Sequence, residues 1–280
     1  APLSAMLADH DLIVVLGAPI FTFHVDGDGP LFGSGVPIFQ LTENPASAAR
    51  ATVGTSIVGA MRPMLEALLA GTSPAPCTRH TPLGRSRVEP PSGGDPISAE
   101  FVMHMLSRAM PRDAVIVEEA PSHRAAMQRH LPIRTSGGFY NMASGGLGWG
   151  LPAAVGVALA RPARRVICVI GDGSTMYSVQ AWWTAAQLRL PLTTVILNNT
   201  GYGAMRAFSQ MMQLGPVPGI DLPGLYFVAL ASGQGCDAFR VRRAHEVPGA
   251  LRAALDASRP TVVEIGVEDA VADLYAGDRR

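Results

Sequence analysis

The chain has 280 residues, of which 48% are hydrophobic and 16% are charged, so it can bury a large core and form two domains. Its formal net charge is zero, which argues against a nucleic-acid partner and against binding to an anionic membrane. All 22 basic residues are arginine, and the lack of lysine excludes a Schiff-base mechanism and a P-loop lysine within this chain.

Three further features bear on the cellular compartment and on whether the chain is part of a larger protein. The apolar run at 12–21 is too short to span a bilayer, and we expect no membrane partner. The three cysteines are too widely spaced for a disulfide framework or a zinc site, which favours a reducing, cytoplasmic setting: Cys77, Cys168 and Cys236. Because the chain begins at Ala1 without a signal-peptide pattern, we expect it to be the interior of a larger protein.

In chain order, the first seventy residues alternate between strand and helix patterns. Strands are predicted at 11–19 and 36–44, and a helix is predicted at 56–70, with Pro63 at its start or at a kink. Residues 71–96 are rich in proline, glycine and serine and have no periodicity, which predicts a linker.

Strand and helix patterns alternate again after the linker. Six strands are predicted, at 114–118, 138–140, 165–170, 192–197, 237–241 and 260–267. Helices are predicted at 97–110, from 122, at 146–160 and 175–188, from 202, and at 225–232 and 246–257. This alternation predicts an α/β fold with a doubly wound, parallel six-stranded sheet over 97–268, followed by a tail at 269–280.

Two consecutive predicted strands end in small and oxygen-bearing residues: Gly171-Asp172-Gly173-Ser174 and Asn198-Asn199. Ordinary turns would explain these residues, because strands commonly end in turns. Ligands, however, bind at the carboxyl ends of strands in open parallel sheets, and one anionic and one neutral oxygen suit Mg²⁺ with phosphate as a further ligand. The glycines allow a close approach of the backbone, and Ser174 opens a helix whose N-terminus favours phosphate. The pattern therefore predicts a metal-bridged diphosphate site.

The spacing of the two pieces makes this prediction specific. Gly173 and Asn198 are separated by 24 residues, and Gly-Asp-Gly followed at this distance by Asn-Asn is the signature of thiamine-diphosphate (ThDP) enzymes. The chain also resembles the C-terminal half of the benzoylformate decarboxylase family, within the pyruvate-decarboxylase/acetolactate-synthase superfamily. Six segments carry this resemblance: 12–24, 43–51, 143–160, 169–187, 198–208 and 217–227. It implies the ThDP-binding fold for 97–268 and a partial central α/β domain for 1–70.

The resemblance also implies roles for individual residues around the cofactor. Asp172 and Asn199 would bind Mg²⁺ through their side-chain oxygens, and Gly201 would bind it through its backbone carbonyl. The residues at the diphosphate would be Gly171, Gly173, Ser174 and Ser122, while the neighbouring family hydroxyl falls on Pro121, which removes one hydrogen bond.

The remaining roles concern the reacting end of the cofactor. The Gly145 carbonyl would accept a hydrogen bond from the aminopyrimidine, and Leu147 would be the apolar wedge that bends ThDP into its reactive conformation. Met205 and Phe208 would lie near the substrate side chain. Trp182 and Trp183 are expected to be packing residues, and His123 is expected at the surface or just behind the site.

The activity that the resemblance implies is the ThDP- and Mg²⁺-dependent, non-oxidative conversion of benzoylformate to benzaldehyde and CO₂, in the mandelate pathway of aromatic catabolism. The activating glutamate and the catalytic histidines of such enzymes lie on segments outside this chain, so the isolated 280 residues are expected to be inactive. The complete protein would be a homodimer or homotetramer. Two alternatives stay open: a carboligating enzyme of the acetolactate-synthase type, and a non-catalytic ThDP-fold protein with a binding or regulatory role.

Overall fold

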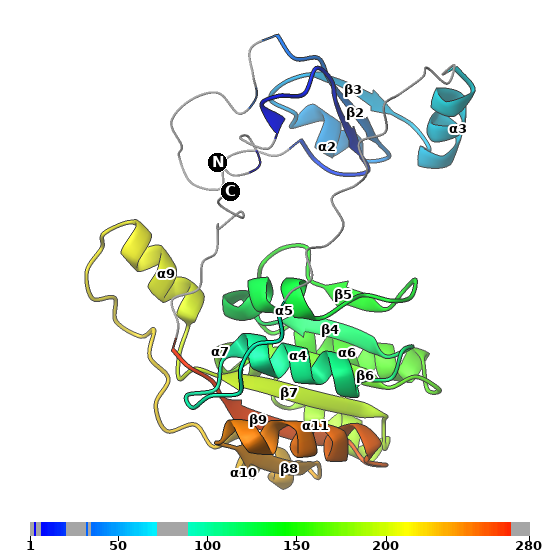
Figure 1. Ribbon diagram of the computed structural model, residues 1–280. Helices are drawn as coiled ribbons and strands as arrows, with labels where there is room; N and C mark the ends of the chain where they lie inside the picture. Colours follow the sequence, from blue (N-terminus) through cyan, green and yellow to red (C-terminus); the bar gives the residue numbers. More distant parts are fainter. Residues whose placement is uncertain (1–2, 4–6, 21–31, 33–34, 72–88, 270–280) are drawn as a thin grey trace. The chain divides into compact units, whose positions relative to one another are not determined.

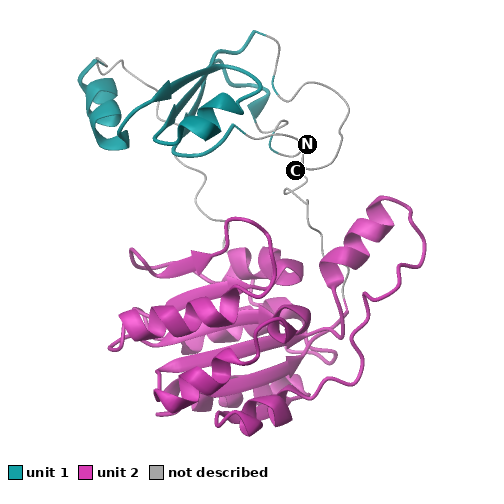
Figure 2. Cartoon of the chain, turned by 180° about the vertical axis from the view of Figure 1, so that it is seen from behind, with its two compact units in different colours: residues 1–84, 275–280 teal, residues 85–274 magenta. Residues whose placement is uncertain are grey.

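A computed structural model of the protein describes residues 3, 7–20, 32, 35–71 and 89–269. The chain divides between 84 and 85 into two compact units, which are coloured separately in Figure 2. Most of the predicted linker and all but the first residue of the predicted tail lie outside the described residues. The assignment of the first unit to a partial central domain stays a prediction.

The first unit contains a small parallel sheet in the order β1-β2-β3. Its strands are β1 (Ile13–Leu16), β2 (Ile38–Thr42) and β3 (Thr55–Val58), and its helices include α2 (Pro45–Ala49) and α3 (Met61–Gly71).

The prediction of a helix over 56–70 is wrong at its amino end, where the structure has β3. Three of the four residues of β3 are β-branched and suit a strand. The fourth, Ser56, donates a hydrogen bond from its hydroxyl to Gln40 Oε1 of β2 at 2.7 Å. The helix begins only at Met61, whose backbone amide donates to Glu43 Oε1 at 2.7 Å, and Pro63 lies in its first turn.

The second unit is built on a six-stranded sheet in the order β5-β4-β6-β7-β9-β8, in which every neighbouring pair is parallel (Figure 1). The strands are β4 (Val115–Glu119), β5 (Phe139–Asn141), β6 (Val166–Gly171), β7 (Leu192–Asn198), β8 (Asp237–Val241) and β9 (Thr261–Gly266). The predicted α/β fold with a parallel six-stranded sheet is confirmed.

Helices cover both faces of this sheet, as in a doubly wound fold. One face packs against α4 (Ala99–Ala109), α5 (Arg124–His130) and α11 (Val247–Asp256), and the other against α6 (Gly150–Ala160), α8 (Ala181–Gln187) and α10 (Phe227–Gly233). Alternate residues of β6 pack against the two helix layers. Ile167 and Val169 face α4 and α11. Val166, Cys168 and Ile170 face α6 and α8. Such strands are buried on both sides, which explains their continuous apolar sequence.

The helix predicted at 175–188 is two helices, α7 (Asp172–Met176) and α8. Between them the backbone makes short turns, because Ser178 N donates to Thr175 O at 3.3 Å and Ala181 N donates to Ser178 O at 3.0 Å. This break lets Trp182 turn into the core, where its indole nitrogen donates to Thr194 Oγ1 of β7 at 3.2 Å. The prediction of a packing role is confirmed for Trp182 and is wrong for Trp183, which is 57% exposed.

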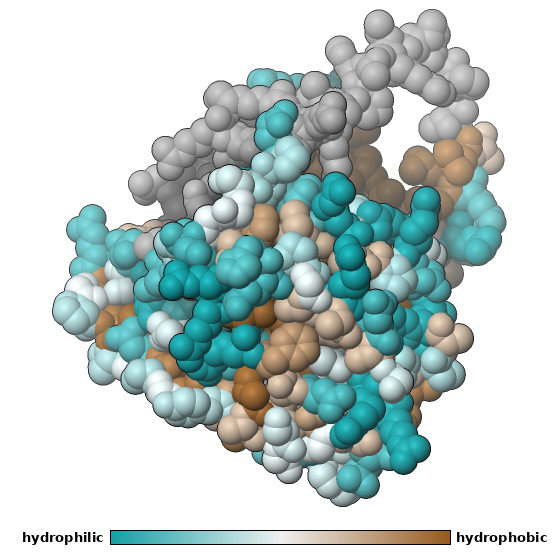
Figure 3. Space-filling view, turned by 60° about the horizontal axis from the view of Figure 1, so that its bottom comes forward, coloured by the Kyte–Doolittle hydropathy of each residue, from teal (hydrophilic) through white to brown (hydrophobic). Residues whose placement is uncertain are grey.

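The surface of the protein is mixed in character. Figure 3 shows one face of the molecule, on which hydrophilic residues surround smaller hydrophobic areas. Within the described part of the chain, no helix has both the length and the apolar character needed to cross a membrane.

Candidate functional site

The sheet brings the ends of the two signature segments together. β6 and β7 are parallel neighbours, with Gly171 paired to Leu197. Asp172 is the first residue of α7, directly after β6, and Asn199 directly follows β7. Both side chains are buried at the carboxyl edge of the sheet, where the sequence predicts a ligand site.

Asp172 is the charged group of this site, and only 2% of its surface is exposed. Its Oδ1 accepts a hydrogen bond from Gly173 N at 2.8 Å, and its Oδ2 accepts one from Gly201 N at 2.9 Å. Burial raises the pKa of Asp172 to about 6, although these amide donors act in the opposite direction. A buried carboxylate of this kind is stabilised in its charged form when a cation binds beside it.

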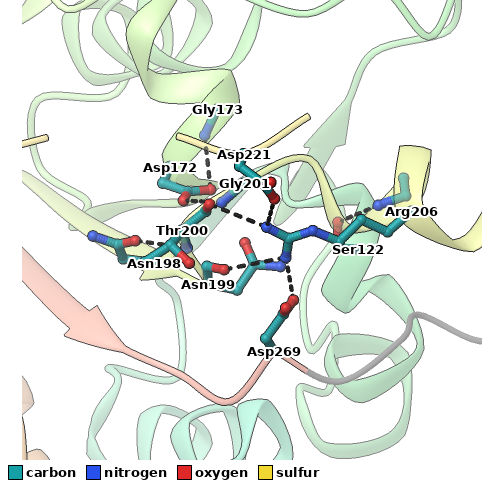
Figure 4. A network of polar contacts seen from close by, with 11 residues as sticks. Ser122, Asp172, Gly173, Asn198, Asn199, Thr200, Gly201, Arg206, Asp221 and Asp269 are labelled. Carbon is teal, nitrogen blue, oxygen red and sulfur yellow. Dashed lines mark hydrogen bonds and ion pairs between the residues drawn. The ribbon is translucent and has the colours of Figure 1, made fainter. Parts of the chain in front are cut away.

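The side chain of Asn199 points at two other oxygen atoms (Figure 4). The inner atom of its amide lies 2.9 Å from Gly201 O and 3.2 Å from Asp172 Oδ1. If this atom is nitrogen, it donates to both acceptors. If it is oxygen, three oxygens converge, which is favourable only with a cation between them.

With the oxygen of Asn199 turned inward, the three oxygens form a set that can bind a hard cation. Among the described residues, no three His, Cys, Asp or Glu side chains lie close enough to one another to hold a metal. The Asp172, Asn199 and Gly201 set is different in kind, since it combines one carboxylate with an amide oxygen and a backbone carbonyl.

Ser122 joins the same site from the segment that follows β4. It lies in the short 3₁₀ helix η1 (Pro121–His123), and its Oγ accepts a hydrogen bond from Ala204 N at 2.9 Å, in the first turn of α9 (Gly203–Met211). A Cβ on Gly203 would lie 2.9 Å from Ser122 Oγ and 2.7 Å from Asn199 Nδ2. Only glycine allows these two side chains to approach the start of α9 so closely.

Gly173 also permits a close approach, because a Cβ there would overlap the ring of Tyr202. Its amide is already occupied by Asp172 Oδ1, and α7 is only five residues long. The predicted phosphate site at this helix N-terminus stays a prediction. Ser174 is buried, and its Oγ would lie 4.0 Å from a Cβ on Gly171, so these two residues lie together at the start of α7.

The turn that carries Gly145 and Leu147 is held to the same edge of the sheet by Glu119, a residue that no sequence motif indicates. Glu119 ends β4, is fully buried, and accepts hydrogen bonds from Gly148 N at 2.6 Å and from Gly150 N. An acidic pair closing an apolar strand is the signal that could have identified it. Leu147 is half-buried in this turn, and Gly145 is exposed with φ +79°.

The remaining predicted residues lie on or near α9 and η1. Met205 is 48% exposed and Phe208 is half-buried, one helical turn further on. Of the two positions predicted for His123, the surface is wrong, because the residue is buried at 7% exposure. Burial lowers its pKa to about 4. It is therefore neutral at physiological pH, and it directly follows Ser122 in η1.

The arrangement at the ends of β6 and β7 can now be compared with known proteins. Residues 120–265 match the family described as "Thiamine pyrophosphate enzyme, C-terminal TPP binding domain". The chain belongs to this family. The match begins directly after β4 and ends one residue before the end of β9, and so includes every residue of the oxygen cluster.

Individual relatives are also similar. The chain is 41% identical over 268 residues to a benzoylformate decarboxylase of Pseudomonas aeruginosa, a match that covers 95% of this chain and 50% of that protein. Among solved structures, a 4-hydroxybenzoylformate decarboxylase of Rhodococcus jostii is 39% identical with a TM-score of 0.89, covering 95% of this chain and 50% of that one. The chain thus spans about half the length of these relatives.

Acetolactate synthases are similar at lower identity. The large subunit of isozyme 2 from Escherichia coli is 31% identical over 180 residues, which is 63% of this chain and 32% of that protein. The predicted resemblance to benzoylformate decarboxylases is confirmed.

Proposed function

We propose that this chain is the cofactor-binding half of an enzyme that uses ThDP and Mg²⁺ to decarboxylate an aromatic 2-oxo acid such as benzoylformate. The observation that carries the proposal is the convergence of the Asp172 carboxylate, the Asn199 side-chain amide and the Gly201 carbonyl at adjacent strand ends, within a chain that is similar to benzoylformate decarboxylases over 95% of its length.

The types of atom at this point support Mg²⁺. Mg²⁺ binds carboxylate and carbonyl oxygens. The inner atom of Asn199 lies at hydrogen-bond distance, 2.9 and 3.2 Å, from Gly201 O and Asp172 Oδ1, and a half-turn of the amide would present its oxygen to a cation there.

The residues proposed to hold the rest of the cofactor surround this cluster. Gly171, Gly173, Ser174 and Ser122 would contact the diphosphate, and the Gly145 carbonyl would bind the aminopyrimidine. Leu147 would set the bend of the bound cofactor, and Glu119 holds the turn from which it projects. When bound, ThDP supplies the electron sink for loss of CO₂. Met205 and Phe208 would line the pocket for the aromatic ring.

Turnover needs more than this chain. We propose that the activating glutamate and the catalytic histidines belong to other segments of the complete protein, which would be a cytoplasmic homodimer or homotetramer. The isolated 280 residues would then bind Mg²⁺ and ThDP weakly and release no benzaldehyde from benzoylformate. Substantial release of benzaldehyde by this chain alone would contradict the proposal.

Calorimetric titration of the chain with ThDP, with and without Mg²⁺, tests the site itself. We expect binding that requires Mg²⁺ and that Asp172→Ala abolishes, because the only carboxylate of the cluster is lost. Asp237→Ala is the matched control, since Asp237 is exposed at the amino end of β8. Equal binding by both variants would exclude a metal-bridged diphosphate at Asp172.

A second assay distinguishes a decarboxylase from the alternative, a carboligating enzyme of the acetolactate-synthase type. Acetolactate synthases match this chain less closely, but they share the same cofactor domain. The product of the complete gene should convert benzoylformate to benzaldehyde and CO₂. Formation of acetolactate from pyruvate without benzoylformate turnover would favour the carboligating alternative, and Mg²⁺-ThDP binding without either activity would favour a non-catalytic role.

A further inference from the structure

Arg206 of α9 is attached to the loop that carries two of the three cluster oxygens. Its side chain is only 16% exposed. Nη1 donates to the carbonyl of Asn199 at 3.4 Å, and Nη2 donates to the carbonyl of Thr200 at 3.2 Å. Figure 4 shows the guanidinium beside this loop, between the side chains of Asp221 and Asp269.

Two carboxylates hold this guanidinium in place. Asp221 Oδ1 pairs with Nη2 at 2.7 Å, and Asp269, which follows β9, pairs with Nη1. Because two negative charges surround one positive charge, the repulsion between Arg206 and a cation at this site is reduced. The ion pairs also connect three segments that are distant in sequence.

Backbone hydrogen bonds also connect the loop after β7 with the segment that contains Asp221. Tyr202 N donates to Ile220 O at 2.8 Å, and Leu222 N donates to Thr200 O at 2.9 Å, so residues 200–202 pair with residues 220–222. Gly201 must be glycine here, since a Cβ would lie 2.5 Å from Ile220 O and would also overlap Arg206.

Thr200 has an unusual conformation between the two ligand residues. Its φ is +58°, in the left-handed region, which is unfavourable for a β-branched side chain. Such a conformation persists only where the surroundings hold it. Both of its peptide groups are held: Thr200 N donates to Asn198 Oδ1 at 3.0 Å, and Thr200 O accepts from Arg206. The turn at Thr200 brings the inner amide atom of Asn199 to 2.9 Å from Gly201 O.

We propose that Arg206 is a positioning residue which, together with Asp221 and Asp269, holds Thr200 in its left-handed conformation and so prearranges the Asn199 side chain and the Gly201 carbonyl before a cation binds. The inference rests on the proposed Mg²⁺-diphosphate site. Arg206 touches neither the cation nor the substrate in this scheme, and it acts through the shape of the loop.

Hydrogen exchange of the full chain without cofactor tests the positioning directly. Arg206→Ala should accelerate exchange of the Tyr202 and Leu222 amides by about tenfold or more, because the pairing that protects them loosens. Amides in the middle of β7 should not change. Arg259→Ala is the matched control: Arg259 also pairs with a carboxylate, Asp237, and donates to a backbone carbonyl, that of Gly235, at the opposite edge of the sheet. Unchanged exchange in Arg206→Ala would overturn the proposal.

Calorimetric titration of Mg²⁺ into the chain with saturating ThDP tests the consequence for binding. Arg206→Ala should weaken Mg²⁺ by about tenfold to hundredfold, the range typical of groups that orient metal ligands. Arg206→Lys should recover only part of this loss, because one ammonium cannot reach two carbonyls and two carboxylates.

A double variant distinguishes positioning from general destabilisation. Glycine adopts the left-handed conformation readily, so Thr200→Gly in the Arg206→Ala background should restore Mg²⁺ affinity to within about threefold of the unmodified chain. A double variant no better than Arg206→Ala would overturn the role assigned to Thr200. If the unmodified chain binds no Mg²⁺-ThDP, the proposed function fails, and the exchange experiment still decides the role of Arg206.

Discussion

Asp172 and His123 are buried ionisable side chains at the same edge of the sheet, and burial shifts their pKa values in opposite directions. The pKa of Asp172 is raised to about 6 and that of His123 is lowered to about 4, because burial disfavours the charged form of each. For His123, the nearby carboxylates of Glu100 and Asp269 raise the pKa, but by less than burial lowers it. Burial therefore favours the neutral form of both side chains.

The lowered pKa of His123 predicts that the folded protein is less stable at acidic pH. Between pH 6.5 and 4 the unfolded chain binds a proton at His123 and the folded chain does not, so folding stability falls as the pH falls through this window. Between about pH 7.5 and pH 5 this group should remove about 2 kcal/mol from the free energy of unfolding. Urea titrations at both pH values should show that His123→Leu loses that part of the pH dependence. An unaltered dependence in the variant would show that His123 is not responsible.

At the scale of elements, the turn before α6 is fastened to β4 by a single carboxylate. Glu119 accepts from Gly148 N and Gly150 N, and a Cβ on Gly150 would lie 2.8 Å from the Cβ of Glu119. The strand and the turn are therefore in direct contact, and the position of Leu147 depends on that contact.

Removing this carboxylate should loosen the turn. Glu119→Ala leaves one buried and one half-buried amide without an acceptor, and we expect it to lower the free energy of unfolding by about 2 kcal/mol. Urea titration checks the stability, and faster exchange of the Gly148 and Gly150 amides checks the location. Glu246→Ala is the control, since Glu246 also accepts from two backbone amides but is fully exposed, and its loss should change stability much less. Equal effects of the two substitutions would contradict the prediction.

At the scale of the whole molecule, the two units differ in how well their sheets are covered. The second unit buries its sheet on both faces. In the first unit the strand register places four exposed apolar side chains on one face of the three-stranded sheet: Val14, Leu16, Phe39 and Ile57. Parallel sheets are normally covered on both faces, so the first unit has less buried apolar surface per strand.

This difference predicts that the units unfold separately. Since hydrophobic burial is the main stabilising term, the first unit should unfold at lower urea than the second. Hydrogen exchange followed by mass spectrometry should show faster exchange in peptides covering 38–58 than in peptides covering 192–198 and 261–266. A single transition, with equal protection in both units, would mean that they fold as one.

Several elements were predictable because local pattern and tertiary structure agree. The continuous apolar runs of β6, β7 and β9 predict buried parallel strands, and all three are present within a residue or two of their predicted bounds. Patterns failed where packing overrides propensity. Helix-spaced residues at 56–58 form β3, because a paired edge on β2 is available there. The helix predicted at 175–188 breaks so that Trp182 can enter the core.

The amino-acid sequence by itself determined the family, the parallel sheet and the positions of Asp172 and Asn199, because these depend on residue type, spacing and hydrophobic period. It could not reveal that the Asn199 side chain, Gly201 O and Asp172 Oδ1 converge within 3.2 Å of the inner amide atom. Nor could it identify Glu119, which has a partner 29 residues away in the chain, or Arg206, which has one 63 residues away. Only the tertiary structure decides such contacts, since they depend on which strand ends meet and on the conformation of one residue, Thr200, between them.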